Sequence, residues 1–395
     1  MRKLIIGIIA VVSLAMLASC AGGDRSREDL PQITRMDRAD VSAASAATLA
    51  GLQAAAGGAA TGGTVVADVA DGVSNTFYVN EDGVIVFNLW NQTDATHPIS
   101  LGLIRFAELV EELSDGEMMV NIRYRAGNDG DLLAMVNNNQ LDAAIITIWS
   151  AWQSLTPLAN LEALPFMFTN YEDAWAAYEG TLGDWVTANI IVPSGSRALG
   201  FWTNGLRHFT NNVRPITTPA DMIGLRMRSP QTTTHLAMYE AFGSASLALP
   251  FGQVHAGLAA GTFDGQDNPL GNIHAARLYE VQRYLTISNH MFSSAPMIAS
   301  TNFWYSLSAE HQQVLQEASL LASRYQGALT VAMETTQLMQ MEAAGVIVNT
   351  VDMTPFIAAS IPIWAEHMER YGNDIATIAA RYISDTNSLA HQFAD

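Results

Sequence analysis

The sequence predicts an α/β fold, and three observations lead to this conclusion. The chain has 395 residues, of which 49% are hydrophobic, enough for a large core or for two smaller ones. Short β-branched segments alternate with segments of helical periodicity, the pattern of a sheet covered by helices. A helical pattern also runs from Ala309 to about Ala344. A helix of that length measures about 50 Å, so we expect it to bridge two α/β lobes.

The amino-terminal residues predict export and lipid attachment. Arg2 and Lys3 precede an apolar run that is too short to serve as a stable membrane anchor. Leu17-Ala18-Ser19-Cys20 then has the pattern of a lipoprotein signal peptide, residues 1–19, whose cleavage leaves Cys20 first. The alternative is an ordinary signal peptide with an incidental cysteine. We expect a periplasmic or other extracytoplasmic protein, lipid-anchored to a bacterial membrane through Cys20.

Residues 20–75 are rich in Ala, Gly, Ser and Asp and predict a flexible tether. The folded body then starts with a buried-strand pattern at Val84–Trp90, followed by helical spacing from Ile104 to Leu113. Strand patterns recur at 120–124, 141–146 and 198–202, and helical patterns at 132–138, 172–178 and 232–242. Ser308 is the predicted N-cap of the long helix, and Gly345 ends it.

Composition excludes several functions. The formal net charge of −19 argues against nucleic-acid binding. Cys20 is the only cysteine and Lys3 the only lysine, which excludes intramolecular disulfides, zinc–thiolate sites and lysine-based catalysis. Nucleophile, dinucleotide and metalloprotease motifs are missing from the sequence, and the nine histidines lack ligand spacing. We therefore predict no cofactor and no metal, and a capping or turn role for the carboxylate pair Asp264 and Asp267.

One window of this acidic chain is basic. Five arginines and a single acid, Asp221, lie between residues 197 and 228; the arginines are Arg197, Arg207, Arg214, Arg226 and Arg228. A guanidinium offers paired N–H donors that match a carboxylate or a phosphate. The window therefore predicts either an anion site or a solvated basic face.

Six ordered motifs in the second half of the chain carry a family resemblance. They are Trp202-Thr203-Asn204-Gly205-Leu206-Arg207, Arg214-Pro215-Ile216, the Pro219–Pro230 block, Pro250-Phe251-Gly252-Gln253-Val254, Asp264-Gly265-Gln266-Asp267-Asn268-Pro269 and the Tyr284–His290 block. Their order and spacing resemble the DctP-type substrate-binding proteins of tripartite ATP-independent periplasmic (TRAP) transporters. The resemblance extends from about Val84 to Tyr382.

This resemblance implies a periplasmic-binding-protein-like fold, with two α/β lobes around a cleft and a long helix spanning both. Lobe I would comprise residues 76–204 plus about 294–333, and lobe II residues 205–293 plus about 334–385.

The resemblance also implies a set of ligand-binding residues. Arg228 would pair with a substrate carboxylate and Arg207 would be a second polar contact. Asn268 and Phe251 would complete the site, and Gln231 occupies a variable position that tunes specificity. Arg197, Arg214 and Arg226 match no binding position of the family or have the weaker claim to one.

The chain departs from the family at Ala126–Asp131, where a Gln-Leu-Gly turn is common, so the resemblance leaves contacts from lobe I open. Trp149 and Trp152 follow a predicted strand at its carboxyl end, where ligands of α/β sheets commonly bind. These two residues, like Trp90 after the first strand, are candidates to stack on a substrate. The alternative for each is a place in the core or at a lobe interface.

Together these observations predict a solute-binding lipoprotein, not an enzyme. It would capture an organic acid and deliver it to the small and large membrane subunits of a sodium-coupled TRAP permease. A sensor of the same fold serving a signalling partner and an ABC-type binding lipoprotein are the alternatives. A lipid-anchored enzyme using Asp264 or Asp267 ranks below them, because the sequence offers no activated nucleophile or base.

Overall fold

The computed structural model describes residues 76–384 and 388–394. The predicted signal peptide, Cys20 and the predicted tether of residues 20–75 lie outside the described residues. Within the described ranges, no helix has both the length and the apolar character needed to cross a membrane.

The described residues contain a mixed sheet of eleven strands. The strands are β1 (Tyr78–Val79), β2 (Ile85–Trp90), β3 (Met118–Arg123), β4 (Ala143–Ile145), β5 (Ser196–Asn211), β6 (Arg226–Ser229), β7 (Ala245–Ala248), β8 (Gly265–Pro269), β9 (Tyr284–Ile287), β10 (Phe292–Ser300) and β11 (Ile347–Thr350). Their order is β1-β2-β4-β10-β5-β8-β6-β7, with β3 beside β2, and β9 beside β5 and β11. We call β1–β4 and β10 the first section, and β6–β9 and β11 the second section.

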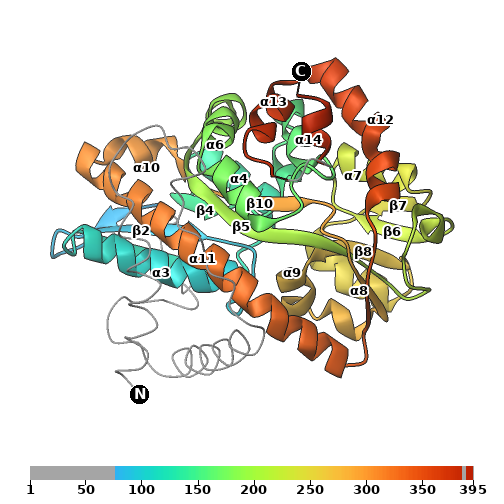
Figure 1. Cartoon of the computed structure of the whole chain (residues 1–395). Helices are drawn as coiled ribbons and strands as arrows, with labels where there is room; N and C mark the ends of the chain where they lie inside the picture. Colours follow the sequence, from blue (N-terminus) through green and yellow to red (C-terminus); the bar gives the residue numbers. More distant parts are fainter. Residues whose placement is uncertain (1–75, 385–387, 395) are drawn as a thin grey trace. The chain divides into compact units, whose positions relative to one another are not determined.

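Strand β5 joins the two sections. It pairs with β10 from Ser196 to Leu206, and with β8 from Arg207 to Asn211. Figure 1 shows it as one long strand crossing the centre of the molecule. The sequence predicted only 198–202 as strand, because the rest of β5 is rich in polar residues that are buried by neighbours from distant parts of the chain.

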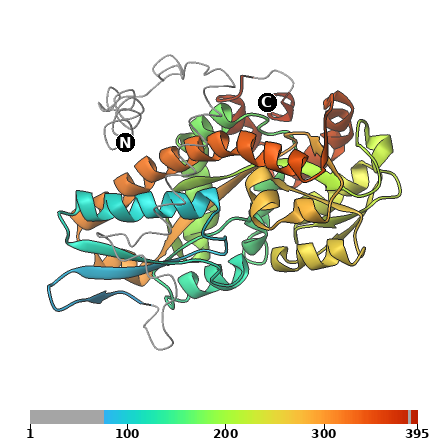
Figure 2. The same cartoon turned by 90° about the horizontal axis from the view of Figure 1, so that it is seen from below.

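Helices cover this sheet. They are α3 (Pro98–Leu113), α4 (Asp129–Asn137), α5 (Tyr171–Tyr178), α6 (Thr181–Val186), α7 (Thr233–Ala241), α8 (Val254–Ala259), α9 (Leu270–Ala275), α10 (Thr301–Ser306), α11 (Ala309–Ala343), α12 (Thr354–Tyr371), α13 (Asp374–Ala380) and α14 (Leu389–Gln392). The predicted long helix is confirmed as α11, and the hydroxyl of its N-cap Ser308 accepts the His311 N–H at 3.1 Å. Figures 1 and 2 both show α11 beside α3, and it also packs on β5 and α9.

Helix α3 begins six residues before the predicted pattern. His97 is its N-cap, with Nδ1 accepting the Ile99 N–H at 3.2 Å, and Pro98 occupies the first helical position. Proline is well suited to that position because its fixed φ is helical and its missing N–H would have had no partner there. The cap therefore places the His97 ring at the start of α3, pointing its other nitrogen outward from the helix.

The crossing of α3 and α11 requires a glycine. A Cβ added at Gly102 would lie 2.6 Å from Cβ of Gln326 and 2.8 Å from the ring of Trp202. Gln326 cannot move aside freely, because its amide forms two hydrogen bonds with the backbone of Thr203, at 3.0 and 2.8 Å. The close approach of the two helices thus depends on the missing side chain.

We expect Gly102→Ala to lower the free energy of unfolding by about 1–3 kcal/mol, the usual cost of overpacking, despite alanine's better helix propensity. Urea unfolding would measure the change. Gly252→Ala is the matched control, since a Cβ there meets nothing within 4 Å. An unchanged midpoint for Gly102→Ala would contradict this account of the helix crossing.

Candidate functional site

Three adjacent strands bring two arginines and one carboxylate together. Strand β8 pairs with β5 on one side, where Phe209 lies opposite Asp267, and with β6 on the other, where Arg228 lies opposite Gln266. Arg207 Nε donates to Asp267 Oδ2 at 2.5 Å, and the same guanidinium also donates to the backbone carbonyl of Asp267. Both side chains are buried. This ion pair links β5 to β8 where β5 passes between the sections.

Arg228 is buried without such a partner. Its side chain is 2% exposed, and its guanidinium donates to the backbone carbonyl of Leu249, with Nε at 2.8 Å. Among the described residues, no carboxylate forms an ion pair with it. Burial and the neighbouring Arg207 lower the pKa of Arg228 to about 10, so it remains protonated at neutral pH. A buried cation held only by a neutral carbonyl favours the arrival of an anion.

Asp267 is also bound by a ring of uncharged side chains. The Tyr239 hydroxyl donates to its Oδ1 at 2.6 Å, while Nε2 of His290 lies 3.3 Å and Nε2 of His235 lies 3.6 Å from Oδ2. Burial alone would raise the pKa of Asp267, but Arg207 and the two imidazoles hold it well below its ordinary value. Asp267 is therefore a fixed anion and a poor candidate for proton transfer.

The histidines in this cluster are neutral at physiological pH. Burial lowers the pKa of His208 to about 3 and that of His235 to about 4, and it also lowers the pKa of His290. His290 is fixed in place, since its ring stacks on Phe209 with centroids 4.1 Å apart. Two guanidinium cations and one carboxylate then give the cluster a net charge of +1, which a single carboxylate ligand would balance.

Asn268 lies on the face of β8 opposite Asp267, the face it shares with Gln266, and connects to the first section. Its amide donates to Gln266, and its Oδ1 accepts the Asn272 amide at 3.4 Å. Asn272 Oδ1 in turn lies 2.6 Å from Nε2 of His97 at the start of α3. Because Nδ1 of His97 is an acceptor, we assign the proton to Nε2, which donates. Burial lowers the pKa of His97 to about 4, which keeps this ring neutral.

The first section carries a second polar cluster at the carboxyl ends of β2 and β4, which pair in parallel. Asp129, in the first turn of α4, accepts the Thr147 N–H at 2.9 Å and its hydroxyl at 2.7 Å, together with the Gln92 amide at 2.6 Å. Asn204 of β5 donates to the Thr147 carbonyl at 3.0 Å. Burial raises the pKa of Asp129 to about 7, although these hydrogen bonds oppose the shift.

Several buried atoms of this cluster have no hydrogen-bond partner among the described residues: Asp129 Oδ1, Asn91 Nδ2 and Asn204 Oδ1. Leaving a buried polar group unpaired costs about 1–3 kcal/mol, so these atoms are suited to pair with a polar ligand. None of these three residues was predicted to be a site residue. The signal was available, because Asn91, Gln92 and Thr147 all follow the carboxyl ends of strands, where only tryptophans were considered.

The remaining predicted site residues occupy varied positions. Trp149 and Trp152 are buried, with ring centroids 4.8 Å apart, and donate their indole N–H groups to Ser294 at 2.9 Å and Ser194 at 3.1 Å. Phe251 is half-buried two residues after Leu249, whose carbonyl binds Arg228. Gln231 is exposed, just after the end of β6. Both tryptophans thus have partners within the core, whereas Phe251 and Gln231 flank the Arg228 region in sequence.

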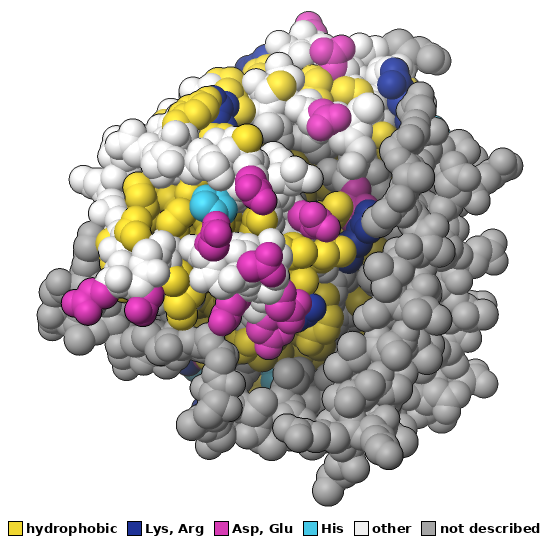
Figure 3. Space-filling model, turned by 90° about the vertical axis from the view of Figure 1, so that its left-hand side faces the viewer, with side chains coloured by type: hydrophobic (Ala, Val, Ile, Leu, Met, Phe, Trp, Pro, Cys, Tyr) yellow, Lys and Arg dark blue, Asp and Glu magenta, His cyan; other side chains and the backbone are white. Residues whose placement is uncertain are grey.

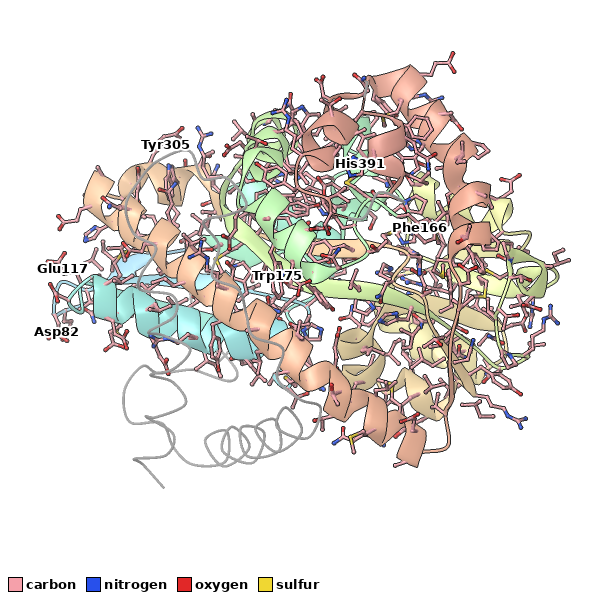
Figure 4. All side chains as sticks on the ribbon, in the orientation of Figure 1. Asp82, Glu117, Phe166, Trp175, Tyr305 and His391 are labelled. Atoms are coloured by element: carbon pink, nitrogen blue, oxygen red, sulfur yellow. The ribbon has the colours of Figure 1, made fainter. Side chains whose placement is uncertain are left out.

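Three arginines of the basic window are engaged elsewhere. Arg226 is exposed and pairs with Asp264 at 2.7 Å, Arg214 donates to the carbonyl of Asp221 at 2.7 Å, and Arg197 lies 5.0 Å from the ring of Tyr305. Figure 4 labels Tyr305 on α10, well away from β6. Asp264 is therefore a surface partner of Arg226. The turn role predicted for Asp267 was wrong, because that residue lies within β8.

A surface hollow elsewhere does not suit an anion. It has a volume of about 430 Å³ and is lined by Asp82, Asp115 and Glu117, with His311 donating toward Glu117 at 2.9 Å. Figure 3 shows acidic side chains outnumbering basic ones on the face it displays. Within residues 76–384 and 388–394, no group of three or more His, Asp or Glu side chains is arranged to hold a metal ion.

Comparisons with known proteins identify the family of this chain. Residues 91–371 match the model of the bacterial extracellular solute-binding proteins of family 7, DctP. The chain is 29% identical over 262 residues to the 2,3-diketo-L-gulonate-binding periplasmic protein YiaO of Escherichia coli K12, covering 66% of this chain and 78% of that protein.

The fold also matches solved structures. One is a TRAP periplasmic solute-binding protein of Roseobacter denitrificans with bound β-D-glucuronate, at a TM-score of 0.70 and 25% identity, covering 76% of this chain and 99% of that one. Another is from Sulfurospirillum deleyianum with bound succinate, at a TM-score of 0.69 and 24% identity, covering 76% and 99%. The predicted fold class is confirmed.

The two buried arginines should respond oppositely to removal of their charge in the ligand-free protein. Arg207→Met should lower the free energy of unfolding by about 3–5 kcal/mol, because Asp267 would be left buried without its cation. Arg228→Met should be neutral or stabilising by about 1–3 kcal/mol, because it removes a buried charge that has no ionic partner. Urea unfolding without added acids would compare them; equal destabilisation would mean that Arg228 is a structural residue.

Proposed function

Because this chain belongs to the DctP family of bacterial extracellular solute-binding proteins, we propose that it binds an organic acid whose carboxylate pairs with Arg228. The observation that carries this proposal is the burial of Arg228 without an anionic partner, in a cluster whose net charge is +1 when Arg228 itself is counted. A carboxylate held by two parallel N–H groups would gain charge-assisted hydrogen bonds and neutralise the cluster. Arg207 would contribute mainly through its positive charge, since its Nε and one terminal nitrogen already donate to Asp267.

The second polar cluster supports a hydroxylated acid as the ligand. Asp129 Oδ1 could accept a ligand hydroxyl, and Asn91 Nδ2 could donate to one. A second carboxylate near Asp129 would be repelled when Asp129 is ionised, which disfavours small dicarboxylates. Sugar acids offer one carboxylate and several hydroxyls. The bound β-D-glucuronate of the Roseobacter protein is a ligand of this kind, whereas the succinate of the Sulfurospirillum protein is not.

Binding would proceed by closure of two lobes. In this proposal lobe I comprises residues 76–204 and about 294–333, and lobe II residues 205–293 and about 334–385. The division falls within β5, between Asn204 of the second polar cluster and Arg207 of the arginine cluster. A ligand that contacts both clusters would favour the closed state, because it would bind that state more tightly than the open state. The His97–Asn272 hydrogen bond would be one of the contacts that closure makes.

Delivery to a membrane permease completes the proposed role. Relatives described as TRAP solute-binding proteins support the small and large TRAP membrane subunits as the partners. Sodium coupling of the permease and a lipid anchor at Cys20 are further parts of the same proposal. The family match favours this role over that of an ABC-type binding lipoprotein.

Arg228→Lys should test the carboxylate contact. It keeps the charge but loses the paired N–H geometry, so we expect the affinity for the acid to fall about 10- to 100-fold. Calorimetry with D-glucuronate, D-galactonate, pantoate and succinate would first identify a binder of the wild type. Arg226→Lys is the matched control, two residues away on the same strand and exposed. Absence of any binder, or equal affinity in Arg228→Lys, would refute the proposal.

Asp129→Asn should distinguish the ligand classes. It replaces an acceptor oxygen with an amide and removes the negative charge, so affinity for a uronate should fall about tenfold. Affinity for succinate should stay the same or rise, because repulsion of its second carboxylate is relieved. The same titrations would measure both. Stronger glucuronate binding by the variant would argue against Asp129 as a hydroxyl acceptor.

A further inference from the structure

The backbone of β5 is irregular where it passes from one section to the other. Its pairing with β10 shifts register there: Thr203 lies opposite Ser294, but Gly205 lies opposite Ser293, so Asn204 is an extra residue. Gly205 has a φ of 135°, a conformation that other residues avoid. A bulge of this kind re-aims the strand that follows it, and the next side chains include Arg207.

Two side chains from other elements fix this bulge. The Leu206 N–H donates at 3.1 Å to the hydroxyl of Tyr171, the first residue of α5. That hydroxyl donates to Oε1 of Glu334, on α11. The backbone of β5 is thereby connected through one phenol to a carboxylate on the long helix. The contact is tight, since a Cβ added at Gly205 would lie 3.3 Å from the same hydroxyl.

The surroundings hold the phenol in place. Tyr171 is buried and stacks on Trp175, with ring centroids 5.4 Å apart. Trp175, labelled in Figure 4, donates its indole N–H to the Thr203 hydroxyl at 2.8 Å and lies against Gly327 of α11. Thus α5, β5 and α11 meet at the bulge, and the position of the Tyr171 hydroxyl is set by packing.

We propose that Tyr171 and Glu334 are positioning residues that hold the β5 bulge in the form that places Arg207 and Asn204 for ligand binding. An ionised Glu334 accepts a charge-assisted hydrogen bond and polarises the phenol, whose oxygen then binds the Leu206 N–H more strongly. Protonation of Glu334 weakens both bonds. The effect on ligand affinity rests on the proposed function, whereas the effect on the bulge does not.

The geometry makes this pair sensitive to pH. Burial raises the pKa of Glu334 to about 7, although the bond from Tyr171 opposes the shift, and Tyr171 is the titratable group in contact with it. Other charged or titratable groups on elements packed against α11 have partners of their own. On α3, Arg105 binds Glu108 and Glu112. On β5, Arg197 binds Tyr305, Arg207 binds Asp267, and His208 accepts the backbone N–H groups of residues 288 and 289. His274 of α9 binds Gln340, and Asp173 of α5 binds Asn170 and Ser384.

The direction of the pH dependence distinguishes a positioning role for Glu334 from a contribution to global stability. Because the folded-state pKa of Glu334 lies above its unfolded value, its contribution to the free energy of unfolding is present at low pH and is lost as pH rises through about 7. The Leu206 hydrogen bond changes in the opposite direction, since it strengthens as Glu334 ionises. If Glu334 had only a structural role, the free energy of unfolding and the strength of the Leu206 hydrogen bond would change in the same direction with pH.

Amide hydrogen exchange at Leu206 in the ligand-free protein tests the pair directly. Corrected for intrinsic exchange, protection of Leu206 should rise several-fold from pH 6 to pH 8 in the wild type and in the control Glu317→Gln, an exposed position on the same helix. In Glu334→Gln, the protection of Leu206 should no longer depend on pH. In Tyr171→Phe, it should fall about tenfold, the fold-change that corresponds to one net hydrogen bond. Protection that follows global stability, or that is unchanged in both variants, would overturn the proposal.

Calorimetry with D-glucuronate supplies the second readout. Glu334→Gln should weaken binding several-fold at pH 8 and flatten its pH profile, while Glu317→Gln should match the wild type. Normal affinity and an unaltered profile in Glu334→Gln would overturn the positioning role even if exchange at Leu206 changed. If no acid bound the wild type, the proposed function would fail, and the exchange experiment would still decide whether the pair controls the bulge.

Discussion

The ion pair between Arg207 and Asp267 is the interaction on which the rest of the site depends. It ties β5, the strand shared by both sections, to β8, and it does so inside the protein, where an unpaired charge would be costly. Tyr239, His235 and His290 complete the environment of the carboxylate. Because Arg207 is satisfied by Asp267, the neighbouring Arg228 is the cation left without a counter-charge, and the site as a whole is prepared for one anion.

In this arrangement the Arg207–Asp267 pair stabilises the fold, whereas Arg228 is left for the proposed ligand. The histidines are kept neutral by burial, so the charge of the cluster is set by two guanidiniums and one carboxylate over the physiological pH range. A buried cation without an ionic partner destabilises the free protein, and the proposed carboxylate ligand would remove that cost on binding. On the other side, unpaired atoms of Asp129, Asn91 and Asn204 present hydrogen-bonding groups instead of charge. The cluster around Arg228 thus suits a carboxylate, and the cluster around Asp129 suits hydroxyls.

The cluster around Arg228 and the cluster around Asp129 are connected through β5 and α11. Asn204 is the extra residue of a bulge and Arg207 follows it by three residues, so the backbone conformation of this short segment sets the direction of both side chains. Helix α11 contacts this segment through Gln326 at Thr203 and through Glu334 and Tyr171 at Leu206. The long helix is therefore more than a cover for the sheet, because its side chains specify the backbone conformation at the crossing.

The sequence by itself determined the α/β class, the long helix with its Ser308 cap and the family, because these rest on periodicity, local capping and ordered motifs. The same motifs are the basis for proposing Arg228 and Arg207 as binding residues. The sequence could not supply the full length of β5, the partner of Arg207 or the polar cluster around Asp129. Those depend on pairing between strands far apart in the chain: Arg207 and Asp267 are 60 residues apart, and Asp129 meets Gln92 and Thr147 only because β2, β4 and α4 pack together. Tertiary structure alone decided which charged residues were buried, and burial determines whether a carboxylate is a partly exposed partner of a surface arginine, as Asp264 is, or a fixed counter-ion inside the protein, as Asp267 is.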